Sequence, residues 1–135
     1  MNEALKIENI NKFFDEIGKP VSTNFVYGYE DPKNSSFLLL GSLSVIDQKY
    51  YIAAFFENEI VLAPLTRTGK FQGNYISIPQ NQIKDIRVKK GLIQYKVIID
   101  IDNQKYILKC NKFIFNIPWQ KENIQHLENN AWYIK

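Results

Sequence analysis

The clearest pattern of apolar and polar positions in the chain lies between Gly91 and Cys110. Apolar side chains occupy alternate positions there, and polar ones fill most of the gaps: Ile93, Tyr95, Val97, Ile99 and Ile101, then Tyr106, Leu108 and Cys110. Between the two series stands the polar run Asp102-Asn103-Gln104, which suits a tight turn. A two-residue period is that of a half-buried strand, so the pattern predicts a β-hairpin with one buried and one solvent-exposed face.

Further short apolar runs, each bounded by turn residues, predict a mainly β domain. We expect strands at residues 37–46, 50–57, 60–66, 75–78, 83–90, 92–101 and 105–113. Seven consecutive strands with short links predict an antiparallel meander, because parallel neighbours need longer crossovers. We expect Pro79 to end the fourth strand and Gly91 to allow the turn before the sixth.

Two amphipathic segments predict helices that flank this β region. Residues 3–17 carry apolar side chains at spacings of three and four, and Gly18 ends the pattern. A second apolar stripe runs from Trp119 to about Asn130, after Pro118, and we expect it to cover one mouth of a small barrel. Within a single domain, we expect residues 1–36 to pack as helix and extended connector, with an irregular strand at 21–29, on a barrel of residues 37–135.

The size and composition of the chain indicate an ordinary globular domain. It has 135 residues, of which 45% are hydrophobic and 23% are charged. The single cysteine, Cys110, is expected to be a buried hydrophobe in a reducing compartment. No run approaches the roughly 18 apolar residues of a membrane span, and the first residues show no secretory pattern. We therefore expect a cytoplasmic protein.

The net charge of +3 is unevenly distributed along the chain. Residues 1–66 hold five Lys and Arg against nine Asp and Glu (−4), whereas residues 84–121 hold nine against three (+6). Five of these cations share the outward phase of the predicted strands: Arg87, Lys89, Lys96, Lys105 and Lys109. This face is a candidate surface for anionic lipid headgroups. The simpler interpretation is a solvated sheet face that lysines protect from aggregation.

A second candidate contact is the loop at residues 67–74. It contains two glycines together with two cations and an aromatic residue: Arg67, Lys70 and Phe71. Loops of this kind can carry function. The alternative interpretation is a flexible connection.

The sequence contains no recognisable catalytic or metal-binding pattern. Its one histidine, His126, lies on the predicted C-terminal helix, and its one thiol lies on the inward face of a strand. Nucleophilic catalysis or metal binding needs several such groups together. Asp100 and Asp102 are more simply explained as partners of lysines across the hairpin. We expect no enzymatic activity, no metal site and no cofactor.

The order of several short motifs along residues 37–130 resembles one protein family. The motifs are Tyr51-Ile52-Ala53-Ala54, Ile60–Leu65 with Gly69-Lys70, Ile76-Ser77-Ile78-Pro79 with Ile83, Val88–Leu92 with Tyr95-Lys96, and Trp119–Asn123. In this order they resemble the small bacterial pleckstrin-homology-like (PH-like) proteins. The resemblance implies a seven-stranded antiparallel barrel capped by a C-terminal helix, with a binding or scaffold role.

Two departures limit what the resemblance implies. The segment Phe56-Glu57-Asn58-Glu59 is acidic where the family often carries a Thr and an Arg. The loop Asp47-Gln48-Lys49-Tyr50 holds one cation and one acid, whereas phosphoinositide binders place several cations there. Recognition of inositol phosphates is therefore not implied.

The leading functional hypothesis is a non-enzymatic interaction or scaffold module that binds a protein partner or itself. It is motivated by aromatic residues outside the core pattern, namely Phe71, Trp132 and Tyr133. The alternative is peripheral binding to anionic membrane lipid headgroups through the basic strand face. Nucleic acid is not expected as a partner, because the strand aromatics Tyr95 and Tyr106 are in the inward phase and not among the cations.

Overall fold

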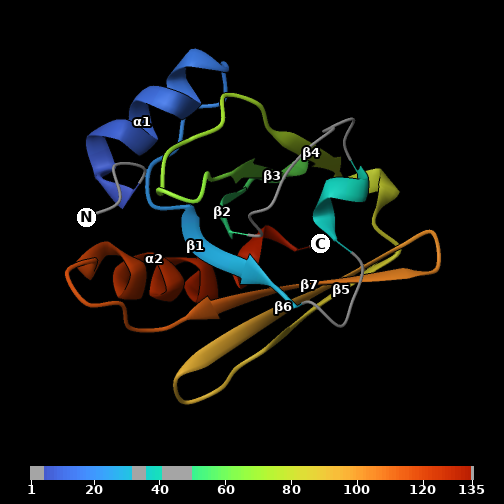
Figure 1. Cartoon of the computed structure of the whole chain (residues 1–135). Coiled ribbons are helices and arrows are strands. Elements are labelled where there is room, and N and C mark those ends of the chain that lie inside the picture. Colours follow the sequence, from blue (N-terminus) through green and yellow to red (C-terminus); the bar gives the residue numbers. More distant parts are fainter. Residues whose placement is uncertain (1–4, 32–35, 41–49, 135) are drawn as a thin grey trace.

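The computed structural model describes residues 5–31, 36–40 and 50–134. In this part of the chain the protein is mainly β, with a single antiparallel sheet and two α-helices (Figure 1). The strands are β1 (Phe25–Glu30), β2 (Tyr50–Phe55), β3 (Glu59–Pro64), β4 (Ile76–Pro79), β5 (Asp85–Lys89), β6 (Gln94–Ile101) and β7 (Gln104–Asn111). The helices are α1 (Ile7–Glu16) and α2 (Pro118–Asn129), and the 3-10 turns are η2 (Phe37–Leu40), η3 (Gln80–Gln82) and η4 (Ala131–Tyr133).

The strand order follows the predicted antiparallel meander, except that β4 and β5 do not pair in the described part of the chain. It runs β4-β3-β2-β1-β7-β6-β5, with antiparallel pairing throughout. Strands β1–β4 and β5–β7 form two meanders, and the pairing of β1 with β7 joins them. In the described part of the chain, β4 and β5 are edge strands at opposite ends of the order. The sheet is therefore open, and the prediction of a closed seven-stranded barrel is wrong in this respect.

The central strand, β1, comes from the segment that the sequence predicted only as an irregular strand. Its residues Val26, Gly28 and Glu30 face the interior, and a glycine and an acid there obscure the apolar alternation of a strand.

The strand predicted at residues 37–46 is the 3-10 turn η2 at Phe37–Leu40, and residues 41–46 lie outside the described part of the chain. The apolar run Phe37–Leu40 has no period that distinguishes a strand from a helical turn.

A glycine is needed where β1 meets β7. A Cβ atom on Gly28 would lie 2.9 Å from both Cδ1 of Leu108 and the backbone oxygen of Lys109. Such a contact is far inside ordinary van der Waals distance, and the backbone oxygen cannot move aside. Gly28 therefore allows the central strand to approach its neighbour.

The inner core forms where the curved sheet encloses its own inward face. Strands β6 and β7 supply the alternating residues that the sequence predicted: Tyr95, Val97, Ile99, Ile101, Tyr106, Leu108 and Cys110. Ile93 is an exception, since it is 75% exposed although its phase predicted burial. Burying an aliphatic or aromatic side chain stabilises a fold by about 1.5–3 kcal/mol, so this core dominates the stability of the protein.

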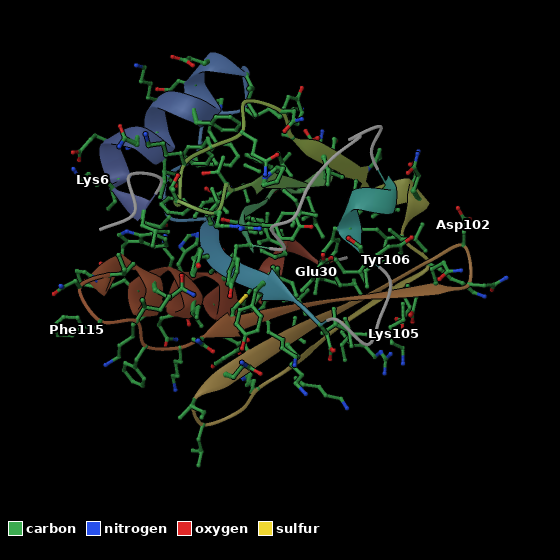
Figure 2. The ribbon with its side chains drawn as sticks, viewed as in Figure 1. Lys6, Glu30, Asp102, Lys105, Tyr106 and Phe115 are labelled. Atoms are coloured by element: carbon green, nitrogen blue, oxygen red, sulfur yellow. The ribbon has the colours of Figure 1, made fainter. Side chains whose placement is uncertain are left out.

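Aromatic rings from outside the strands complete the inner core. The ring centroid of Phe37 in η2 lies 5.6 Å from that of Tyr51 and 5.7 Å from that of Tyr106. The carboxylate of Glu30 holds this turn, because it accepts hydrogen bonds from the Phe37 amide and the Ser36 hydroxyl, both at 2.9 Å. Figure 2 shows Glu30 and Tyr106 in the same region of the fold. Burial, followed by the charge of Glu30, raises the pKa of Tyr51.

The opposite face of β1–β3 is covered by α1 (Figure 1). Ile10, Phe13 and Phe14 of this helix pack on strand residues to form a helix-side core: Phe25, Ile52, Ala54, Val61 and Ala63. Trp119 also belongs to this core and not to the inner core, so the prediction that it plugs a barrel mouth is wrong. Its Nε1 donates a hydrogen bond of 2.9 Å to the carbonyl of Leu5, which ties the start of α2 to the segment before α1.

Two buried amides of α2 dock this helix on β1. Strand β1 pairs with β7 only at Tyr29 and Glu30. Before these residues, Gln120 bridges the strands, since its Oε1 accepts from the Tyr27 amide (3.0 Å) and its Nε2 donates to the carbonyls of Tyr27 (2.8 Å) and Asn111 (3.0 Å). Asn123 donates to the carbonyl of Phe25 at 3.0 Å. The amides thus supply hydrogen bonds that strand pairing does not.

Candidate interaction surface

Three lysines form a row across the outer face of β5, β6 and β7. Lys89 lies opposite Lys96 in the ladder, and Lys96 lies opposite Lys109; we call them the lysine row. The Cβ atoms of directly opposed residues are about 4.5–5.5 Å apart, and like charges at that separation destabilise a sheet. The positive charge of Lys109 is partly compensated, because its Nζ lies 3.5 Å from Oδ2 of Asp31. The row would gain from a negatively charged surface.

The other two cations of the predicted basic face lie beside carboxylates. The guanidinium of Arg87 is 3.1 Å from Oδ2 of Asp85 and 3.7 Å from Oδ2 of Asp100. Lys105 is opposite Asp100 in the ladder and follows the β6–β7 turn that contains Asp102. The positive charge of the face is therefore concentrated at the lysine row.

The three residues of the predicted loop contact differ in exposure: two are in solvent and one packs on the core. Arg67 and Lys70 are exposed on the loop between β3 and β4. Phe71 is half-buried, and its ring stacks on that of Phe13 in α1, with centroids 4.4 Å apart and an interplanar angle of 9°. Phe71 is thus a packing residue of the helix-side core.

Two further aromatics that the sequence placed outside the core are packed. Trp132 lies in the inner core, where its ring centroid is 5.2 Å from that of Phe55. Tyr133 is half-buried, and its hydroxyl is 2.8 Å from Nε2 of His126. The protein-binding hypothesis therefore loses the aromatics that motivated it.

The part of the chain that the structure describes shows neither a group of metal-ligating side chains nor a reactive thiol. No group of three or more His, Cys, Asp or Glu side chains there lies close enough to hold a metal ion. Burial raises the pKa of Cys110 to about 12, so this thiol is protonated at neutral pH and unreactive.

Four large apolar side chains are exposed on two loops at one end of the sheet. Leu92 (91% exposed) and Ile93 (75%) lie in the β5–β6 turn, and Phe113 (60%) and Phe115 (91%) lie in the loop between β7 and α2. We call these four residues the apolar tip. Large apolar side chains exposed at one end of a sheet are candidates for contact with proteins or membranes.

The two loops of the apolar tip are joined by the backbone. The amide of Lys112 donates a hydrogen bond of 2.8 Å to the carbonyl of Ile93. Gly91 is required in the first loop, because a Cβ there would collide with the carbonyl oxygen of Gln94. Figure 2 shows Phe115 pointing away from the ribbon, at the end of the molecule opposite to Asp102 and Lys105.

Cations surround the apolar tip. The Nζ atoms of Lys112 and Lys121 lie 6.0 and 5.2 Å from the ring centroid of Phe113, within cation–π distance. Lys90 forms an ion pair of 2.7 Å with Glu128. The lysine row lies next to the tip, because only two ladder pairs, Tyr95–Cys110 and Gln94–Asn111, separate Lys96–Lys109 from the two loops.

A pocket of about 720 Å³ opens beside the apolar tip, between the β7–α2 loop and the first turns of α2. Tyr95, Ile117 and Ile124, all buried, line its inner end. Phe113, Ile114 and Pro118 line its sides. Ligand pockets commonly have volumes of about 300–1,000 Å³ and mostly apolar walls, so this pocket is of a size and character that suit a small apolar group.

The sequence revealed the cations but not the apolar tip. The two-residue alternation along the predicted strands correctly placed Lys89, Lys96 and Lys109 on one face, because alternation decides which side of a sheet a residue faces. It assigned Ile93 and Phe113 to predicted strands, although both lie in loops. The available signal was the position of Leu92-Ile93 immediately after the turn residue Gly91.

No family model and no curated protein matches the chain. In the described segments, neither helix combines the length and the apolar character that crossing a bilayer requires.

Proposed function

We propose that this protein is a non-enzymatic, PH-like interaction module that binds anionic membrane surfaces through the apolar tip and the neighbouring lysines. The site of action that we propose is the cytoplasmic leaflet, whose lipids carry net negative charge. This proposal moves the membrane contact from the middle of the basic strand face to the end of the sheet.

The PH-like part of the proposal is supported by the arrangement of the elements. Two antiparallel meanders, β1–β4 and β5–β7, are joined by the pairing of β1 with β7 around one core, and an amphipathic helix follows the last strand. This arrangement agrees with the resemblance in sequence motifs. The helix α1 is an addition to that pattern.

The observation that carries the membrane proposal is the exposure of Leu92 and Phe115, each 91% exposed, beside lysines. Insertion of such side chains into the acyl boundary removes apolar area from water, at about 25 cal/mol per Å². Each lysine near an anionic leaflet adds about 1 kcal/mol of attraction. The combination gives reversible binding that depends on both lipid charge and apolar insertion.

Co-sedimentation with lipid vesicles tests this proposal. We expect the protein to bind vesicles that contain phosphatidylglycerol and to bind pure phosphatidylcholine vesicles much more weakly. The double variant Leu92→Ser/Phe115→Ser is expected to lower the partition coefficient at least tenfold, because each serine removes more than about 1.4 kcal/mol of apolar transfer. Raising the salt concentration to 1 M should also weaken binding, since it shortens the Debye length to about 3 Å.

Tyr75→Ser provides the matched control, because Tyr75 is an exposed aromatic immediately before β4, which is at the opposite end of the strand order from β5. We expect this control to bind vesicles as the wild type does. Binding that is indifferent to phosphatidylglycerol content and to the Leu92→Ser/Phe115→Ser change would refute the proposal.

A second candidate function, association with a protein partner or a second copy of the chain, is favoured by the open edge of β5. This strand pairs only with β6 in the described part of the chain. Its other edge therefore offers backbone groups for strand addition. Light scattering over a concentration series tests self-association: a mass twice the 15.9 kDa of the monomer would support it, and a constant monomer mass would exclude it.

A further inference from the structure

The geometry points to a second, more specific role for the pocket beside the apolar tip: it binds the single acyl chain of an anionic amphiphile, with the acidic head group held between Lys112 and Lys121. This inference rests on the proposed membrane function, since the same end of the molecule faces the bilayer. It adds a stoichiometric ligand site to a surface that otherwise makes only non-specific contacts.

The interior of the pocket suits a hydrocarbon chain. Its inner end is formed by the buried side chains of Tyr95, Ile117 and Ile124, which belong to the two cores. Ile114 is partly buried against the helix-side core, so the wall is supported from behind. An apolar chain that enters this volume is removed from water without displacing any hydrogen bond described above.

The rim of the pocket suits an acidic head group. The ammonium groups of Lys112 and Lys121 both lie over the Phe113 ring, at 6.0 and 5.2 Å, and the Lys112 ammonium is also 6.0 Å from the Tyr95 ring. These contacts hold two cations on the wall of the apolar space. Glu122 is the one acid that lines the pocket, so two positive charges face one negative charge. A carboxylate or phosphate is therefore favoured over a cationic head group.

The position of the pocket explains how a chain would reach it. Phe113 belongs both to the apolar tip and to the pocket wall. Phe113 therefore joins the surface that faces the bilayer to the wall of the pocket. Leu92 and Phe115 do not line the pocket, so the membrane contact and the ligand site can be changed independently.

Isothermal titration calorimetry with sodium laurate, below the concentration at which it aggregates, tests the inference without a bilayer. We expect saturable binding of one laurate per chain. Gln125→Trp places a large ring at the exposed lining position of α2 and should weaken binding at least tenfold. Lys112→Glu/Lys121→Glu should also weaken it at least tenfold, because both cations become acids.

Matched controls separate the pocket from general effects. Lys84→Glu/Lys105→Glu makes the same charge change outside the pocket, with Lys105 at the β6–β7 turn, and should alter laurate affinity less than threefold. Leu92→Ser/Phe115→Ser should also keep laurate binding within threefold while it loses vesicle binding. Far-UV circular dichroism melts of each variant show whether it has folded.

Two arms distinguish the source of the ligand. Saturable binding of laurate that Gln125→Trp abolishes supports a site for free fatty acids, and the same result with monomeric lysophosphatidylglycerol supports a site for a bilayer lipid. Three results would overturn the inference: no binding of either amphiphile, equal binding by the wild type and both pocket variants, or equal affinity for dodecyltrimethylammonium. If vesicle binding persists in any of these cases, the pocket inference fails and the proposed membrane function stands.

Discussion

Val97→Lys is expected to unfold the protein at 25 °C, or to lower its free energy of unfolding by at least about 4 kcal/mol. Val97 is fully buried in the inner core, between the sheet and α2. A lysine there must either bury an unpaired ammonium group or lose its proton, and both are costly. Urea unfolding, followed by the fluorescence of the two buried tryptophans Trp119 and Trp132, measures the change.

Ile93→Lys is the matched control for this variant. Ile93 and Val97 belong to the same series of alternating apolar residues in the sequence, but Ile93 is exposed in the β5–β6 turn. We expect its replacement by lysine to change the free energy of unfolding by less than about 0.5 kcal/mol. Wild-type stability of the Val97→Lys variant would mean that the inner core is not sealed.

Gln120→Met is expected to destabilise the protein by about 3–5 kcal/mol. Methionine has a similar volume, but it leaves the Tyr27 amide and the carbonyls of Tyr27 and Asn111 without their hydrogen bonds to Gln120. Each lost hydrogen bond costs about 0.5–1.5 kcal/mol net, and a buried polar group that is left without a partner costs more. Chemical denaturation measures the loss, and faster hydrogen exchange at the Tyr27 amide would locate it.

Gln125→Met is the control, because Gln125 lies on the same helix but is exposed and bonds only to Asn129 in the contacts described. Its effect should be within about 0.5 kcal/mol. Equal stability losses for the two variants would show that the bridge between β1 and β7 does not depend on the Gln120 amide.

The β6–β7 hairpin was predictable from sequence because its signals are local. Alternation identified the inward residues from Tyr95 to Cys110, and the reversal occurs where Asp102 and Asn103 adopt positive φ angles of 49° and 64°. Asp and Asn tolerate this conformation better than most residues. The signal that ends α1 was also local. Gly18, which the sequence predicted to end this helix, follows it with a φ of 76°.

The central position of β1 could not be read from local pattern. Two of its interior residues are explained by contacts with other parts of the fold. Leu108 approaches Gly28 closely, and Glu30 accepts hydrogen bonds from the 36–37 segment. The pairing of β1 with β7 is likewise a long-range contact. The sequence predicted a closed meander because local alternation does not show that β4 and β5 stay unpaired with each other in the described part of the chain.

The candidate surface was predictable only in part. Charge and phase located Lys89, Lys96 and Lys109, but phase cannot tell where a strand ends and a loop begins. The exposed positions of Ile93 and Phe113 follow from the ends of β6 and β7 in three dimensions. The pocket depends on the path of the chain from Asn111 to Pro118, which has no regular period.

The pairing of Tyr29 with Lys109 has a consequence for how the protein is made. During synthesis, β2–β4 can form early as hairpins, but β1 obtains its second neighbour only after β7 has left the ribosome. The Gln120 contacts to β1 come later still. Folding of the complete domain is therefore expected only after β7 and α2 have been made, and it should be slow compared with helical proteins of this size, because contacts between distant residues must close the largest loops.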